Sequence, residues 1–129
     1  MEGKSTHTGR FVVSEPIRGE KVVFDTKTKL MWQGSHAMAK TWEEAKHYSK
    51  SLKDGGYSNW RLPTVEELEG LTDKSLKDPA SDFPGMPSTW FWSSSSYATN
   101  NNKAWYVYFA NGNVSNYSKI GSLDVRCVR

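Results

Sequence analysis

One stretch rich in turn-forming residues, positions 55–64, constrains the fold more than any other part of the chain. It opens with Gly55 and Gly56, which can adopt the positive φ that ends a helix in the left-handed conformation. Near its end, Pro63 biases the preceding residue toward extended backbone. Between them, Trp60 is a large apolar side chain that we expect to anchor the core. The stretch therefore predicts that one helix ends before it and that a second begins directly after Pro63.

Two capping signals predict where these helices begin. Thr41 and Glu44 have the spacing of a capping box, in which the two side chains satisfy unpaired backbone amides of the first turn. Thr64 and Glu67 repeat that spacing. Apolar residues then recur at helical intervals after each threonine. The two amphipathic helices expected from this pattern cover residues 42–52 and 65–72.

Strands are expected on both sides of the helical region, where short runs of β-branched and aromatic residues lie between turn residues. The expected strands are 11–13, 21–24, 30–33, 90–93, 104–109, 114–119 and 123–128. The pair Asn111-Gly112 is a strong hairpin-turn signal. Helices in the middle with strands at both ends predict an α+β fold. The segments expected to be loops are 34–40, 73–88 and 94–102.

Length and composition limit the class of protein. The chain has 129 residues, enough for a single domain, which we expect over 11–129 after a flexible segment at 1–10. Its one cysteine, Cys127, excludes an intrachain disulfide. No apolar run approaches the roughly 20 residues of a membrane span, so membrane insertion is not expected. The polar N-terminal residues lack the apolar core of a signal peptide.

Neither catalysis nor nucleic-acid binding is expected. The histidines His7, His36 and His47 have no ligand spacing, and a single cysteine adds too little for a zinc site. No Gly-x-Ser-x-Gly elbow provides a nucleophile. The net charge is +3, but the basic residues are dispersed and no recognition-helix or zinc-finger motif accompanies them. We therefore expect no enzyme, no metal or other cofactor, and no nucleic-acid partner.

The candidate binding surface is a run rich in Tyr, Ser and Asn between residues 94 and 119. Tyrosine supplies rigid amphipathic area, while serine and asparagine supply adaptable hydrogen bonds, as in many recognition surfaces. Aromatic faces also stack on sugar rings. The alternative is that these are solvated strand and turn residues. The candidate ligand-binding residues are Tyr97, Asn100, Asn102, Lys103, Tyr106, Tyr108, Asn113, Asn116, Tyr117 and Lys119.

Other large or charged side chains carry separate expectations. Trp90 follows a loop rich in Pro and Ser and is the tryptophan most expected to be exposed. Lys103 and Lys119 flank the candidate surface and would meet sulfates or carboxylates of a ligand in a salt-dependent manner. Solvated lysines without a partner are the alternative. Arg126 is expected to pair with a carboxylate. The tryptophans expected in the core are Trp32, Trp42, Trp60, Trp92 and Trp105.

Several motifs follow one another in order along residues 20–129. They are FDTKTKLMWQ at 24–33, TWEEA at 41–45, GGYSNWRLPT at 55–64, FWSSS at 91–95, AWYV at 104–107 and VRCVR at 125–129. Together they resemble the Lcl C-terminal domain family, which is named from a collagen-like bacterial surface adhesin. The family is similar to the formylglycine-generating enzymes and to variable proteins diversified by retroelements. The resemblance implies a C-type-lectin-like fold, with antiparallel sheets, two flanking helices and paired N- and C-terminal strands.

The resemblance also implies a function. It suggests a non-enzymatic, adhesin-like ligand-binding module at the cell surface or outside the cell, with anionic glycans of the glycosaminoglycan type as first candidates. The calcium-site triplets of sugar-binding C-type lectins are absent, so we expect binding without calcium. Family members often pair a cysteine of the first helix with the terminal one. Here that helix position is Ser49, so we expect Cys127 to be a buried, inert thiol near Ser49.

A second function, from another class, stays open. The late sheet would then be the protein–protein interface of a structural or assembly domain, and the chain would form a homo-oligomer. An exposed apolar patch would favour this alternative, whereas a hydrophilic Tyr/Asn face would favour a glycan ligand.

Overall fold

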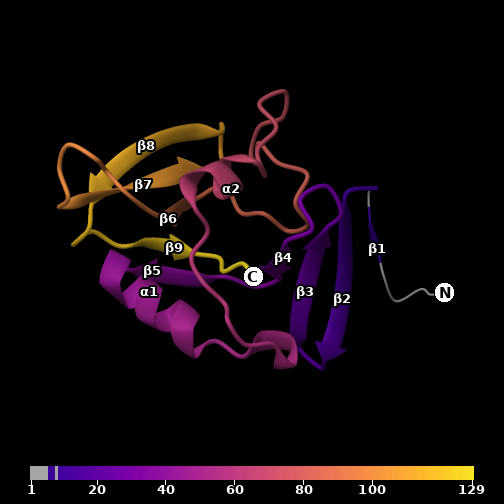
Figure 1. Ribbon diagram of the computed structural model, residues 1–129. Coiled ribbons are helices and arrows are strands. Elements are labelled where there is room, and N and C mark those ends of the chain that lie inside the picture. Colours follow the sequence, from indigo (N-terminus) through magenta and orange to yellow (C-terminus); the bar gives the residue numbers. More distant parts are fainter. Residues whose placement is uncertain (1–5, 8) are drawn as a thin grey trace.

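Two β-sheets and two short helices make up an α+β fold, as expected from the sequence (Figure 1). The computed structural model describes residues 6–7 and 9–129. Of the flexible segment expected at 1–10, positions 1–5 and 8 lie outside the described residues, and Thr6–His7 form strand β1. The elements that follow are β2 (Phe11–Ile17), β3 (Glu20–Asp25), β4 (Met31–Gln33), β5 (Ala37–Lys40), α1 (Trp42–Ser51), the 3₁₀ turn η1 (Asp54–Gly56), α2 (Val65–Glu69), β6 (Trp90–Ser96), β7 (Lys103–Tyr108), β8 (Asn113–Ser118) and β9 (Leu123–Val125).

The two sheets divide the chain between them. The first contains the N-terminal strands in the order β1-β2-β3-β4, all antiparallel. The second has the order β5-β9-β6-β7-β8 and is antiparallel except for the parallel pair of β6 and β9. Val128, the residue before the last, bridges Trp32 of β4 and Arg61. The expected pairing between the two ends of the chain is therefore made through β4, which bridges to Val128, and β5, which pairs with β9. β2 does not take part, because it lies between β1 and β3.

The turn that joins β3 to β4 is organised by one buried carboxylate. Asp25 accepts two hydrogen bonds from the guanidinium of Arg10, at 2.8 and 2.7 Å. It also accepts hydrogen bonds from the amide of Lys27 (3.0 Å) and the hydroxyl of Thr28 (2.9 Å). Burial alone would raise the pKa of this carboxyl, but the hydrogen bonds outweigh burial and hold the pKa below its usual value. The aspartate and threonine of this turn are therefore structural.

Both capping boxes form, and they set where the helices begin. Thr41 Oγ1 accepts a hydrogen bond from the amide of Glu44 at 3.3 Å, and the Glu44 carboxylate accepts one from the amide of Thr41 at 2.9 Å. Thr64 and Glu67 make the same two bonds at the start of α2, at 3.1 and 2.9 Å. Each cap satisfies amides that the first turn leaves unpaired.

The glycine-rich stretch turns the chain after α1 has ended. Gly55 and Gly56 have φ of 69° and 81°, so the expected positive φ is confirmed. They lie in η1, however, because α1 ends four positions earlier, at Ser51. α2 is shorter than the helix expected at 65–72, since Gly70, a poor helix former, caps it.

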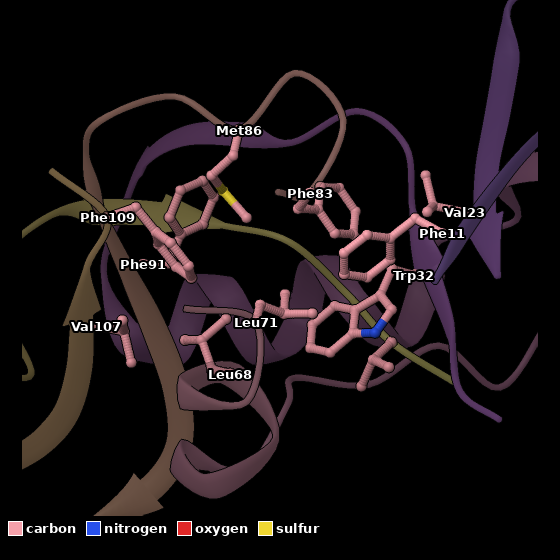
Figure 2. Packing of buried hydrophobic residues seen from close by; sticks show 11 residues of the cluster. Phe11, Val23, Trp32, Leu68, Leu71, Phe83, Met86, Phe91, Val107 and Phe109 are labelled. Carbon is pink, nitrogen blue, oxygen red and sulfur yellow. The ribbon is translucent and has the colours of Figure 1, made fainter. Parts of the chain in front are cut away.

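The first core cluster fills the space between the two sheets and α2 (Figure 2). Phe83 comes from the long loop before β6, and its ring meets Phe11 edge-on at 5.3 Å and Trp32 at 6.3 Å. Figure 2 shows Leu68 and Leu71 reaching into the same cluster beside Trp32. The loop at 73–88 is free of strands and helices, as expected, yet it closes this core.

The second core cluster lies under α1 and contains three of the tryptophans expected in the core. Trp42 of α1 donates its indole N–H to the carbonyl of Ser93 at 2.9 Å. Trp92 of β6 donates its indole N–H to the carbonyl of Lys40 at 2.8 Å. Trp60 is buried in this cluster, which confirms its expected role. Of the tryptophans expected in the core, Trp32, Trp42, Trp60 and Trp92 are buried, whereas Trp105 is only half-buried.

Besides β1, one further strand was not expected. Residues 37–40 were expected to be a loop, but they form β5, which pairs with β9 through Ala37–Val125 and Lys40–Leu123. The pairing is irregular between these two points, where Ala39 has φ of 56°. No local alternation marks this strand, because its partner supplies the reason for its extended backbone. β6 also continues to Ser96, into the segment expected to be a loop at 94–102.

Candidate functional site

The pairing register sorts the side chains of β6, β7 and β8 onto two faces of the sheet, because directly opposite residues point to the same side. Val107 lies opposite both Phe91 and Val114, and this core face packs on the first core cluster. The other face is here called the aromatic face. It carries Trp90, Trp92, Tyr106, Tyr108, Asn113 and Tyr117.

The candidate ligand-binding residues are therefore divided between the two faces. Lys103 and Asn116 lie on the core face, opposite Ser118 and Trp105. Tyr97, in the turn after β6, packs its ring edge-on against Trp105 at 5.1 Å. The candidates on the aromatic face are Tyr106, Tyr108, Asn113 and Tyr117, with Lys119 directly after β8.

Two of the asparagines have local structural roles in the turn between β6 and β7. Asn100 Oδ1 accepts a hydrogen bond from the amide of Asn102 at 3.0 Å. The carbonyl of Asn102 accepts a hydrogen bond from the amide of Lys119 at 2.9 Å, which ties this turn to the end of β8. These contacts fit the interpretation of Asn100 and Asn102 as turn residues.

A recess of about 330 Å³ opens on the aromatic face. Its walls come from β6, β7, β8 and the segment that leads into β9, and none of its lining side chains is charged. Tyr106 and Tyr117 were expected at a binding site, and Trp90 was expected to be exposed. Ser122 and Leu123 carry no sequence signal for binding, since only the turn after β8 brings them here. The lining residues are Trp90, Tyr106, Tyr117, Ser122 and Leu123.

The aromatic rings around the recess hold one another in place. Trp90 stacks on Tyr108 with ring centroids 4.4 Å apart and planes 9° from parallel. Tyr106 meets Tyr117 edge-on at 6.4 Å, and Tyr117 also approaches Trp92 at 6.2 Å. Such pairs add to the free energy gained by burial and restrict ring motion.

The recess is open because α1 covers only part of the aromatic face. Trp92, near α1, is fully buried, whereas Trp90, two residues earlier on the same face, is 44% exposed. Tyr117 is 46% exposed, and Ile120, in the turn that follows it, is 87% exposed. The expected exposure of Trp90 is thus confirmed, and two large aromatic side chains remain accessible at the recess.

Two lysines lie next to the recess. Lys119, two residues after Tyr117, donates a hydrogen bond from Nζ to Ser96 Oγ at 2.9 Å and lies 4.0 Å from the ring centroid of Trp42. Lys40 is directly opposite the lining residue Leu123. The Lys40 ammonium lies 5.4 Å from the ring centroid of Tyr48, so both ammonium groups lie over aromatic rings of α1.

The terminal strand segment is structural. Cys127 is fully buried, as expected, and burial raises the pKa of its thiol to about 12. Such a thiol is protonated and unreactive at neutral pH. Ser49, the helix residue expected near it, is also buried and donates its hydroxyl to the carbonyl of Lys46 at 2.8 Å.

The expectation that Arg126 pairs with a carboxylate is wrong. Arg126 Nη1 instead donates to the backbone carbonyls of Gln33 and Gly34, both at 2.8 Å. The ring of Phe83 lies 4.5 Å from the guanidinium carbon, and burial lowers the pKa of Arg126 to about 10. The carbonyl of Ser35 is a third acceptor for Nη1, at 3.2 Å. Backbone carbonyls at the end of β4 and directly after it therefore take the place of the expected carboxylate.

Other pockets among the described residues have linings that differ from that of the aromatic recess. A cavity of about 490 Å³ near Arg10 and Lys74 has a mixed-charge lining that includes Asp73 and Asp82. Among residues 9–129, no group of three or more His, Cys, Asp or Glu side chains is arranged to hold a metal ion. No helix in the described part of the chain is long and apolar enough to cross a membrane.

Most of the chain matches the model of a known family. Residues 21–129 match the family model of the Lcl C-terminal domain. The matched range contains both helices, the whole five-stranded sheet and every residue that lines the recess. A search of curated proteins found no match.

Proposed function

Because the chain belongs to the Lcl C-terminal domain family, we propose that it is a non-enzymatic, adhesin-like binding module whose aromatic recess holds a glycan. The observation that carries this proposal is the uncharged recess of about 330 Å³ on the aromatic face. Binding sites of small ligands are concave and mostly apolar, with a few polar groups that fix orientation. The family suggests a location at the cell surface or outside the cell.

The chemistry of the recess suits a sugar ring. The exposed rings of Trp90 and Tyr117 offer flat apolar surfaces for the C–H face of a pyranose. The hydroxyl groups of Tyr106, Tyr117 and Ser122 can donate to and accept from sugar hydroxyls. A rigid aromatic surface with a few adaptable hydroxyls also limits the entropy lost on binding.

The charges beside the recess favour an anionic glycan, such as a glycosaminoglycan. Lys119 follows the lining residue Tyr117 by two positions, and Lys40 pairs with the lining residue Leu123. Neither lysine has an ion-pair partner among the described residues. Attraction between exposed charges is screened over about 8 Å at physiological ionic strength, so binding should weaken with salt.

The proposed binding is independent of calcium. Calcium sites need several carboxylate or carbonyl oxygens around one point. The recess is lined by aromatic, hydroxyl and aliphatic side chains, and the carboxylate-containing triplets of sugar-binding C-type lectins are absent from the sequence. The ligand would instead be held by stacking, hydroxyl contacts and the two lysines.

A glycan array that includes sulfated glycosaminoglycans tests the proposal, with and without chelator and at two salt concentrations. We expect binding that resists the chelator and that falls at least tenfold in Trp90→Ala and Tyr117→Ala. Tyr97→Ala is the matched control, because that ring packs on Trp105 at the core face. Lys119→Ala, compared with Lys103→Ala, should reduce only the salt-sensitive part of binding. An array without bound glycans, or equal losses in Tyr97→Ala and Tyr117→Ala, would contradict the proposal.

A further inference from the structure

β8 is the outer strand of the five-stranded sheet (Figure 1). Its six residues pair with β7 in one uninterrupted register, from Lys103–Ser118 to Tyr108–Asn113. No other described strand pairs with it. One edge of β8 therefore presents backbone N–H and C=O groups without a strand partner.

The register shows which backbone groups face outward. The amide of Lys119 donates to the carbonyl of Asn102 on the β7 side at 2.9 Å. Inward and outward positions alternate along an antiparallel strand. Positions 117, 115 and 113 therefore also hydrogen-bond toward β7, and the N–H and C=O groups that point away from the sheet belong to Val114, Asn116 and Ser118. Of these, the carbonyl of Ser118 already accepts a hydrogen bond from the amide of Gly121 at 2.9 Å.

β8 lacks the features that usually protect an edge strand, which are charges, proline and bulges. Its sequence, NVSNYS, contains no charge and no proline, and its pairing with β7 has no bulge. The opposite edge strand, β5, is irregular, has a positive φ at Ala39 and ends in Lys40. The free edge of β4 is covered by the C-terminal residues through Trp32–Val128. β8 is thus the unprotected edge of this sheet.

We propose that β8 pairs antiparallel with β8 of a second copy of this chain, about a two-fold axis at Asn116. This register places Asn116 opposite its own copy and Val114 opposite Ser118, so the outward N–H and C=O groups of 114 and 116 and the N–H of 118 gain a partner. The carbonyl of Ser118 would accept from Val114 of the other copy as well as from Gly121 of its own. The closest lysine, Lys119, would face the neutral Asn113. No like charges oppose one another, and two-fold pairing is the commonest symmetry of soluble oligomers.

The pairing makes a prediction about the recesses. A two-fold axis perpendicular to the sheet keeps the same face of both copies on the same side. The two aromatic faces would then be continuous, with Tyr117 of each copy opposite Ser115 of the other. Two linked recesses would bind a repeating polymer more tightly than one, by raising the effective concentration at the second site. The pairing itself does not depend on what the recess binds.

The association is expected to be weak and dependent on concentration, since one strand edge buries less surface than a standard interface of about 1,600 Å². Sedimentation equilibrium of the full chain over a wide concentration range should show the weight-average mass rising toward twice that of the monomer. A mass that stays at the monomer value, or that rises toward three or more copies, would overturn the proposal.

Substitutions at the two-fold position give a sharper test. In Asn116→Lys or Asn116→Asp, two like charges would face each other, so we expect each variant to be monomeric where the native chain dimerises. An equimolar mixture should dimerise again, because Lys then faces Asp. Asn101→Lys, at an exposed turn position, is the matched control and should dimerise normally. A mixture that stays monomeric, or an Asn116→Lys variant that dimerises, would overturn the proposal.

A proline variant keeps the test independent of charge. The amide of Asn116 points outward, so Asn116→Pro removes one intermolecular donor without removing a hydrogen bond to β7. We expect this variant to keep its circular dichroism spectrum and to lose dimerisation at least tenfold. Folded Asn116→Pro that dimerises as the native chain does would exclude pairing through this edge.

Discussion

The ring of Tyr117 lies directly on the backbone of Gly121. A Cβ atom built on Gly121 would overlap Cε2 of that ring and would lie 2.9 Å from Cδ2. Gly121 follows the turn in which its amide donates to the carbonyl of Ser118 at 2.9 Å. Because Gly121 has no side chain, the ring of Tyr117 can pack on its backbone, and this contact fixes the position of one lining residue of the recess.

Gly121→Ala should therefore impair ligand binding without touching a lining side chain. The added methyl group would push the half-exposed ring of Tyr117 away from its place between Tyr106 and Trp92. We expect a loss of affinity within threefold of that in Tyr117→Ala. The free energy of unfolding should change by less than about 1 kcal/mol, because the ring can move toward solvent.

A double-mutant cycle provides the control for this prediction. In a Tyr117→Ala background, Gly121→Ala has no ring to displace and should cost no further affinity. An undiminished loss in that background would mean that Gly121 acts through the backbone of the turn. Affinity for the best glycan from the array, measured by calorimetry, is the readout.

Asp25 should make stability depend on pH. The folded pKa of Asp25 lies below its value of about 3.9 in the unfolded chain. Its contribution to stability is therefore complete well above pH 3.9 and is lost as the pH falls through the folded pKa. Asp25→Asn should lower the free energy of unfolding by about 2–3 kcal/mol at pH 7, since it removes the buried carboxylate that pairs with the half-buried guanidinium of Arg10.

Urea unfolding of both chains at pH 7 and at pH 3 measures this effect. The difference between the native chain and Asp25→Asn should shrink at pH 3. Asp82→Asn, at an exposed position, serves as the control and should change stability by less than about 0.5 kcal/mol. A difference that is the same at both pH values would show that the charge of Asp25 is not what stabilises the turn.

The parts of the fold that follow from local chemistry could be predicted from the sequence. The capping boxes at Thr41 and Thr64 form as expected, because both partners of each box lie within one helical turn. The hairpin of β3 and β4 also follows from a local turn. β5 could not be predicted, because its extended backbone depends on β9, which is more than eighty residues away in sequence.

The candidate site was only half predictable for the same reason. The alternation of β7 separates Tyr106 from Trp105, but it does not reveal which face α1 covers. That depends on Trp42 of α1, which donates to the carbonyl of Ser93 in β6, and on Trp92 of β6, which donates to the carbonyl of Lys40 in β5. The sequence pattern therefore grouped Asn116 and Lys103 with Tyr117, although the register places them on the opposite face.

Arg126 should be among the side chains most needed for stability. It is 1% exposed, and its Nη1 holds the carbonyls of Gln33, Gly34 and Ser35. Arg126→Met would leave these carbonyls without their donor, at a cost of about 2–4 kcal/mol in the free energy of unfolding. Thermal and urea unfolding measure the change, and the exposed Arg18→Met is the control. Equal stability of the two variants would show that packing between the phenylalanine rings is sufficient.

Cys127 should not react with thiol reagents in the folded protein. Burial keeps the thiol from contact with solvent and raises its pKa to about 12, so almost none is thiolate at pH 7. We expect no reaction with Ellman's reagent in native buffer and one reacting thiol per chain in denaturant. Ser58→Cys, at an exposed position, should add one thiol that reacts at once. Because Cys127 is the one cysteine of the chain and can form no intrachain disulfide, reducing agent should leave the melting temperature of the native chain unchanged. Rapid labelling of Cys127 without denaturant would instead mean that the terminal segment opens away from β4 under native conditions.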